Sequence, residues 1–137
     1  MDQFKNRVAA VILGIALAYA SITIVGIGAA VAIPSDILKP VAQVSGWLAF
    51  TLVDLFTIAV PLTAAYLLLA MVSKFVIKEP DVTFYALLLA PLVIMQLYLV
   101  VQSQPQLLHN IVTTLPRYLL LAVSFYFLVR STKQANA

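Results

Sequence analysis

The sequence contains no cysteine and only one histidine among its 137 residues. The absence of cysteine excludes disulfide bonds, thiolate metal sites, iron–sulfur clusters and thiol redox chemistry. With His109 alone, haem held between two histidines of one chain and histidine-based metal clusters are excluded as well. We therefore expect this chain to hold no cofactor and no metal.

Charge is also scarce. Charged residues make up 9% of the chain, whereas 64% of its residues are hydrophobic. Soluble domains typically carry about 25% charged and 45–50% apolar residues, so a soluble domain, a disordered chain and a coiled coil are excluded. A membrane-spanning helix needs roughly 20 apolar residues, which leaves room for four spans and little else.

The apolar runs predict an all-α fold, an integral membrane four-helix bundle that occupies residues 1–137 as a single transmembrane domain. The spans are expected at about residues 8–33, 43–73, 82–103 and 107–130. The fourth span has two possible starts: near Leu107, with Pro116 inside the helix, or at Pro116 itself. The later start leaves about fourteen residues, too few to cross without thinning or tilt, so we favour the earlier one.

Basic residues near the span ends predict the orientation. Six of them fall on one side if both termini share that side, against Lys39 alone on the other. The six are Lys5, Arg7, Lys74, Lys78, Arg130 and Lys133. Because cytoplasmic loops carry an excess of Lys and Arg, we expect cytoplasmic termini and a multi-pass protein of the bacterial cytoplasmic (inner) membrane. The same placement explains the net charge of +3 without nucleic-acid binding, which we do not expect.

Small residues recur every four positions in the first span. They are Ala10, Gly14, Ala18, Gly26 and Ala30, with Ile22 as the one break. Small residues at this spacing let helix backbones approach closely in a membrane. We predict a helix contact along this row, either with another helix of the same chain or with a second subunit.

Asp54 and Arg117 are the only formal charges inside the predicted spans. Charged residues within a bilayer normally face protein or water and pair with one another. At about 1.5 Å of rise per residue, Asp54, Arg117 and Gln96 all lie in the outer half of the bilayer. Thr51 and Thr57 share the helix face of Asp54. We predict an intramembrane polar site of these five residues, in which Asp54 and Arg117 pair.

The role of the pair stays open on the sequence alone. It is either a structural bridge that fixes helix register, or two side chains that reach separately to the outer headgroups, or a site for a substrate, ion, proton or partner. Catalysis is not expected, because Asp54 is the only carboxylate within the spans and no serine or threonine has a base near it in sequence. We predict that the chain is not an enzyme.

Three functions fit these observations. The first is an accessory or assembly subunit of a larger membrane complex or homo-oligomer. The sequence has small-residue packing rows for helix contacts, but it has no pattern of catalytic residues and no soluble domain. The second is a small oligomeric transporter or channel that uses the Asp54/Arg117 site. The third is a membrane-perturbing or signalling protein. The expected partners are membrane lipids and other membrane-protein subunits, or further copies of this chain.

Overall fold

The computed structural model describes residues 2–31, 33–77 and 80–135, and within these ranges it is helical without any strand. The elements are α1 (Asp2–Ala30), α2 (Ser35–Val44), α3 (Gly46–Asp54), the π-helix η1 (Leu55–Ala59), α4 (Val60–Val76), α5 (Val82–Gln102) and α6 (Leu107–Ala135). Because α3, η1 and α4 follow one another without a break, they form one helical run. The predicted all-helical class is confirmed.

Four helical runs are long and apolar enough to cross a membrane. They are Gln3–Ala30, Gly46–Val76, Val82–Gln102 and Leu107–Gln134. Helix α6 begins at Leu107 and continues through Pro116, so the earlier of the two possible starts is the one observed.

The second run begins later than the predicted residue 43, because a separate helix comes before it. Helix α2 contains Pro40, buries none of its residues and ends where Ser45 adopts an extended conformation. The Ser45 hydroxyl then accepts a hydrogen bond from the Leu48 N–H (3.4 Å) and caps α3. Serine favours such a cap because its oxygen satisfies an N–H that has no partner within the helix. The connection between the first two spans is thus a short surface helix.

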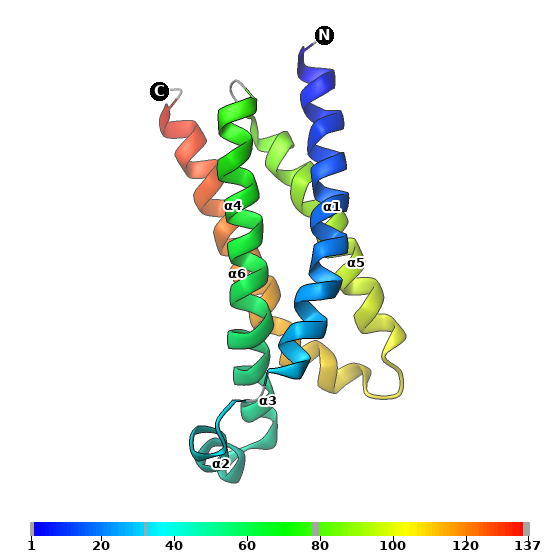
Figure 1. Cartoon of the computed structure of the whole chain (residues 1–137), viewed down its shortest axis with the longest axis vertical. Helices are drawn as coiled ribbons and strands as arrows, with labels where there is room; N and C mark the ends of the chain where they lie inside the picture. Colours follow the sequence, from blue (N-terminus) through cyan, green and yellow to red (C-terminus); the bar gives the residue numbers. More distant parts are fainter. Residues whose placement is uncertain (1, 32, 78–79, 136–137) are drawn as a thin grey trace.

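The ends of the long helices gather at two opposite ends of the bundle (Figure 1). The start of α1, the end of α4, the start of α5 and the end of α6 lie together at what we call the terminal end. Helix α2 and the turn between α5 and α6 lie at the other end, here called the loop end. Helix α1 packs chiefly on α5, and α3 packs on α6. The first two long runs are therefore packed against the last two.

The core between the middle of the bundle and the terminal end is built from large apolar and aromatic side chains. Those that are almost fully buried include Leu62, Tyr66, Phe84, Tyr85, Leu88, Leu92 and Leu121. The Tyr66 hydroxyl donates to the Tyr85 carbonyl oxygen at 3.4 Å, which ties α4 to α5. Gly14 lies against this core, where an added Cβ would come within 2.7 Å of the Leu88 carbonyl oxygen. The backbones of α1 and α5 are therefore in direct contact.

The predicted row of small residues needs a correction. Ala10, Gly14 and Ala18 are buried, but Gly26 and Ala30 are exposed, and an added Cβ at Gly26 would meet no atom within 4 Å. A four-residue step turns an α-helix by about 40° more than a full circle. Over sixteen residues, from Ala10 to Gly26, the row therefore moves by about 160° to the opposite face. No continuous contact along this row exists within the chain.

Gly28, and not Gly26, makes the close helix contact near the end of α1. An added Cβ at Gly28 would come within 2.6 Å of both the Thr57 carbonyl oxygen and the Ile58 side chain. Gly14, Ser21 and Gly28 are each seven residues apart and all three are buried. Because a seven-residue step drifts by only about 20°, this is the spacing that keeps one face toward a partner helix.

Candidate functional site

Asp54 occupies the junction where the second long run changes from α-helix to π-helix. It is the last residue of α3, and in the following η1 the Val60 N–H donates to the Leu55 carbonyl oxygen, five residues back. Pro61 has no backbone N–H, so the ordinary helical ladder already lacks one bond here. Single π turns inside helices are frequent at functional sites. Asp54 itself is buried, with 9% of its surface exposed.

Arg117 reaches Asp54 from α6 and is also buried. It follows Pro116 in the helix, and 6% of its surface is exposed. Its Nη2 forms a salt bridge with Asp54 Oδ1. Its Nη1 donates to Gln96 Oε1 on α5. The planar guanidinium therefore joins three helices, as its fixed fork of donors allows.

The polar contacts continue from Gln96 to the first helix. Gln96 is fully buried, and its Nε2 donates to Ser21 Oγ at 2.9 Å. The Ser21 hydroxyl donates in turn to the Ala18 carbonyl oxygen at 2.6 Å. Ser21, Gln96, Arg117 and Asp54 thus form one hydrogen-bonded chain across all four long runs, which we call the polar chain.

The sequence located three of the four members of the polar chain but missed Ser21. The seven-residue spacing of Ser21 from Gly14 and Gly28 is the signal that would have placed it on the buried face. Thr51 and Thr57 were predicted to belong to the site, yet neither joins the polar chain. Their hydroxyls donate to the carbonyl oxygens of Trp47 and Val53, both at 2.8 Å. Threonine hydroxyls commonly bond to the preceding turn of their own helix in this way.

An open cavity of about 420 Å³ leads from the loop end to the charged pair. Its polar lining consists of Asp54, Thr57, Gln106, His109, Asn110, Thr113, Thr114 and Arg117, and its other walls are Gly28, Ala29, Phe50, Val53 and Ile58. We call this cavity the vestibule. Thr57, although outside the polar chain, is one of its walls, whereas Thr51 is not.

His109 is held in place at the vestibule by two aromatic rings. The centroid of its ring lies 5.2 Å from that of Trp47 and 5.3 Å from that of Phe50, in both cases edge to face at 83°. Edge-to-face packing of this kind is a favoured arrangement of aromatic rings. The contact links α3 to the start of α6, so the rim of the vestibule is a packed structure.

Two polar atoms of the charged pair have no partner within the described part of the chain. They are Asp54 Oδ2 and Arg117 Nε, both of which are buried. Hydrogen bonds to ionised groups are the strong ones, and a buried polar group without a partner is costly. Both residues line the vestibule through other atoms, and these two atoms are themselves closed off from it.

A second surface feature is apolar and runs along the contact between α1 and α4. Three neighbouring cavities of about 350, 420 and 510 Å³ follow each other there from the terminal end to the loop end. Ala16, Ala20 and Ala65 line the middle one. We call this row of three cavities the α1–α4 seam, and Figure 1 shows the two helices side by side on the near face.

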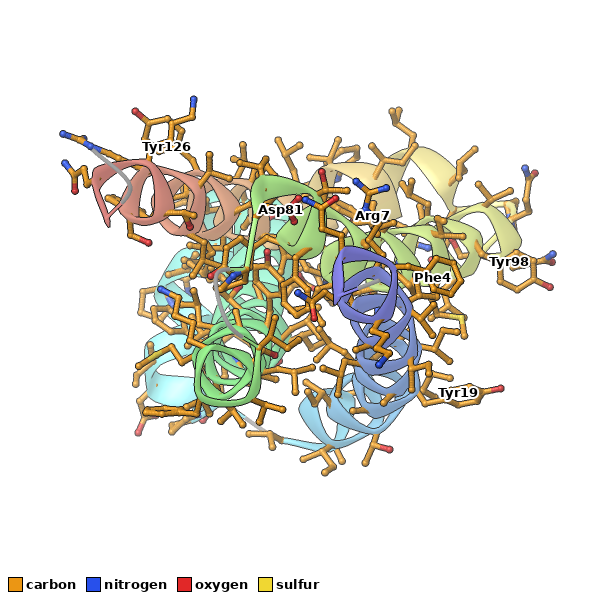
Figure 2. The ribbon with its side chains drawn as sticks, turned by 90° about the horizontal axis from the view of Figure 1, so that it is seen from above. Phe4, Arg7, Tyr19, Asp81, Tyr98 and Tyr126 are labelled. Atoms are coloured by element: carbon orange, nitrogen blue, oxygen red, sulfur yellow. The ribbon has the colours of Figure 1, made fainter. Side chains whose placement is uncertain are left out.

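The outer surface of the bundle is rich in exposed aromatic and aliphatic side chains. Viewed from the terminal end, Phe4, Tyr19, Tyr98 and Tyr126 all point away from the bundle (Figure 2). They are between 58% and 72% exposed. Such a surface, wrapped around a polar interior, is what a lipid environment requires.

Comparison with known proteins identifies no relative of this chain. No family model matches the chain, and neither the curated proteins nor the solved structures contain a significant match to it. The function must therefore be argued from the geometry of the polar chain, the vestibule and the seam.

Proposed function

We propose that this protein is an accessory or assembly subunit of a larger membrane complex or homo-oligomer. The observation that carries the proposal is the α1–α4 seam, a row of three apolar cavities of which the middle one is lined by three alanines. Helices associate in membranes through close packing, and small residues allow that closeness. A transmembrane helix of another subunit, or of a second copy, would fill the groove.

The polar chain supports the same role, because it gives the bundle a fixed shape. A partner helix packs well only against a surface that keeps its form, and a buried hydrogen-bonded network specifies one arrangement of helices. We also propose that the chain is not an enzyme, because Asp54 is the only carboxylate within the predicted spans.

Intact mass measurement after gentle extraction from native membranes tests the proposal. The wild-type protein should be recovered with additional protein subunits or further copies of itself. Ala20→Phe fills the seam at an exposed position and should reduce the assembly to the single chain. Ala86→Phe is the matched control on α5, exposed but outside the seam, and should leave the assembly intact. Recovery of the wild-type chain with lipid alone would reject the subunit role.

The proposal includes an orientation in the bacterial cytoplasmic membrane. The terminal end carries Lys5, Arg7, Lys74, Arg130 and Lys133, whereas Lys39 lies at the loop end. Lys78, the sixth basic residue predicted for the side of the termini, lies outside the described residues. By the positive-inside rule the termini are then cytoplasmic. Reporter fusions after Ala137 and near Pro40 should give opposite signals, and equal signals would contradict this topology.

A second function, that of a small oligomeric transporter or channel, is favoured by the vestibule. A polar cavity that ends at a buried ion pair is typical of sites where a membrane protein receives a polar solute. Uptake by reconstituted vesicles that contain only this chain distinguishes the two functions. Asp54→Asn should abolish such uptake, whereas a pure assembly subunit transports nothing when it is alone.

A further inference from the structure

Helix α2 is amphipathic, and part of its apolar side is exposed. At 3.6 residues per turn its large apolar side chains fall within an arc of about 120°, and its polar side chains fall on the opposite side. The apolar ones are Ile37, Leu38, Val41 and Val44, and the polar ones are Ser35, Asp36, Lys39 and Gln43. Leu38 and Val41 are half-buried. Ile37 and Val44, at the other edge of the apolar side, are 64% and 81% exposed.

The packing of the chain gives α2 little support. The helix has ten residues, none of which is buried, and Pro40 inside it lacks the N–H of the helical ladder. Helices shorter than about 12–15 residues are marginal in water, and in proteins most of their stability comes from packing of an apolar face. An apolar environment for Ile37 and Val44 would supply the stabilisation that α2 lacks.

The position of α2 indicates what this environment is. The run Gly46–Val76 has 31 residues and is about 46 Å long at 1.5 Å per residue. A bilayer is about 40–45 Å thick with its headgroup regions, so the start of this run lies among the headgroups when the run spans the membrane. Trp47, which is exposed there, is of a type enriched at that level. Only Ser45 separates α2 from α3, and Figure 1 shows α2 nearly end-on, with its axis across the long helices.

We propose that α2 is an interfacial helix whose partner is the lipid surface of the leaflet at the loop end. Ile37 and Val44 enter the boundary between headgroups and acyl chains, and the polar side faces the water. Amphipathic helices lie in the plane of the interface in this way. The charges of Asp36 and Lys39 cancel, so apolar burial drives the insertion, and anionic lipid is not required. This interaction goes beyond the proposed subunit role and needs no second subunit.

Single cysteines test the proposal directly, because the chain contains no other cysteine. Ile37→Cys and Val44→Cys place a fluorescent nitrobenzoxadiazole label on the apolar side. Their exposed neighbours Asp36→Cys and Gln43→Cys are the matched controls on the polar side. In phosphatidylcholine vesicles at a high lipid-to-protein ratio, brominated acyl chains should quench the labels at positions 37 and 44 several-fold more than those at 36 and 43. Aqueous iodide should give the reverse order.

An added charge tests whether the apolar side drives the insertion. Ile37→Asp, combined with the label at position 44, should lower the quenching by brominated lipid to the level of the polar-side labels. Ser35→Asp adds the same charge at an exposed position of the polar side, so it is the matched control and should leave the quenching unchanged. Replacement of part of the phosphatidylcholine by phosphatidylglycerol should change none of these values.

Three results would overturn the proposal. The first is that brominated lipid does not quench the apolar-side labels more strongly than the polar-side labels, which includes the case in which protein shields them from both quenchers. The second is that Ile37→Asp has no larger effect than Ser35→Asp. The third is that the difference between the two sides requires phosphatidylglycerol, because the attraction would then be electrostatic. The vesicles contain only this chain, so the outcome does not depend on whether other subunits accompany it in native membranes.

Discussion

The two ends of the bundle are stabilised by different kinds of interaction. Near the terminal end, α1 meets α5 through Gly14, and large side chains such as Tyr66, Tyr85 and Leu88 fill the interior. Toward the loop end, the interior is the polar chain with the vestibule beside it. The first region is specified by shape, whereas the second is specified by the complementarity of charges and hydrogen bonds.

This difference predicts different responses to substitution. A close-packed apolar interior accepts changes that conserve volume and resists changes that add atoms at a backbone contact. A buried ion pair does the opposite, since loss of one partner leaves a charge that nothing compensates. Substitutions in the polar chain should therefore have the larger effects, with strong coupling between the partners.

The largest effect is expected at the ion pair. Asp54→Asn and Arg117→Gln should each reduce the free energy of unfolding by about 3–5 kcal/mol, the usual cost of breaking a buried pair from one side. The double variant should lose less than the sum of the two single losses. Equilibrium unfolding in mixed micelles measures this cycle, with the exposed Lys39→Gln as a neutral control. Strictly additive losses would show that the two side chains do not interact.

The next largest effect is expected at Gln96. Gln96→Leu removes the acceptor for Arg117 Nη1 and the donor to Ser21. Hydrogen bonds to charged groups contribute about 1.5–3 kcal/mol, so a loss of that size in the free energy of unfolding is expected. Gln102→Leu, at the exposed end of the same helix, should be close to neutral in the same assay. Equal losses for both would mean that the polar chain does not stabilise the fold.

A comparable or slightly smaller effect is expected at the two close backbone contacts of α1, at Gly14 with α5 and at Gly28 with η1. Gly14→Ala adds a Cβ within 2.7 Å of the Leu88 carbonyl oxygen, and Gly28→Ala adds one within 2.6 Å of the Thr57 carbonyl oxygen. Overpacking of this kind costs about 1–3 kcal/mol. Gly26→Ala, where nothing lies within 4 Å, is the matched control and should be neutral or stabilising. If all three variants unfold alike, the close approach of the helices is refuted.

The smallest effect is expected at the end of the polar chain. Ser21→Ala removes one neutral interhelical hydrogen bond, and such bonds average about 0.6 kcal/mol within membranes. Thr23→Ala on the exposed face of α1 is the control. If Ser21→Ala lowers the free energy of unfolding as much as Gln96→Leu does, the polar chain acts as one cooperative unit and not as a series of independent hydrogen bonds.

Much of the fold follows from local sequence patterns. The four long apolar runs, the start of α6 at Leu107 and the absence of strands from the described residues depend on hydropathy and helix geometry alone. The meeting of Asp54, Arg117 and Gln96 also follows, because charges of opposite sign at similar depth have few other ways to avoid lipid. These features needed no knowledge of which helix packs on which.

Other features depend on the relative placement of the helices. The burial of Gly28 rather than Gly26 is decided by which face α1 turns toward η1, and a drift of about 20° or 40° per repeat changes that face over several turns. Ser21 is an ordinary serine in the sequence until α5 brings Gln96 to it.

The amino-acid sequence by itself determined that four helices are long and apolar enough to span a membrane, and which two charges pair. Hydrophobicity, helix length and charge are properties of single segments, so they can be read without the rest of the chain. The tertiary structure alone decided the polar chain across four helices, the vestibule beside the charged pair, and the α1–α4 seam. A cavity or a network belongs to no single segment, because it exists only once several helices have taken up one arrangement.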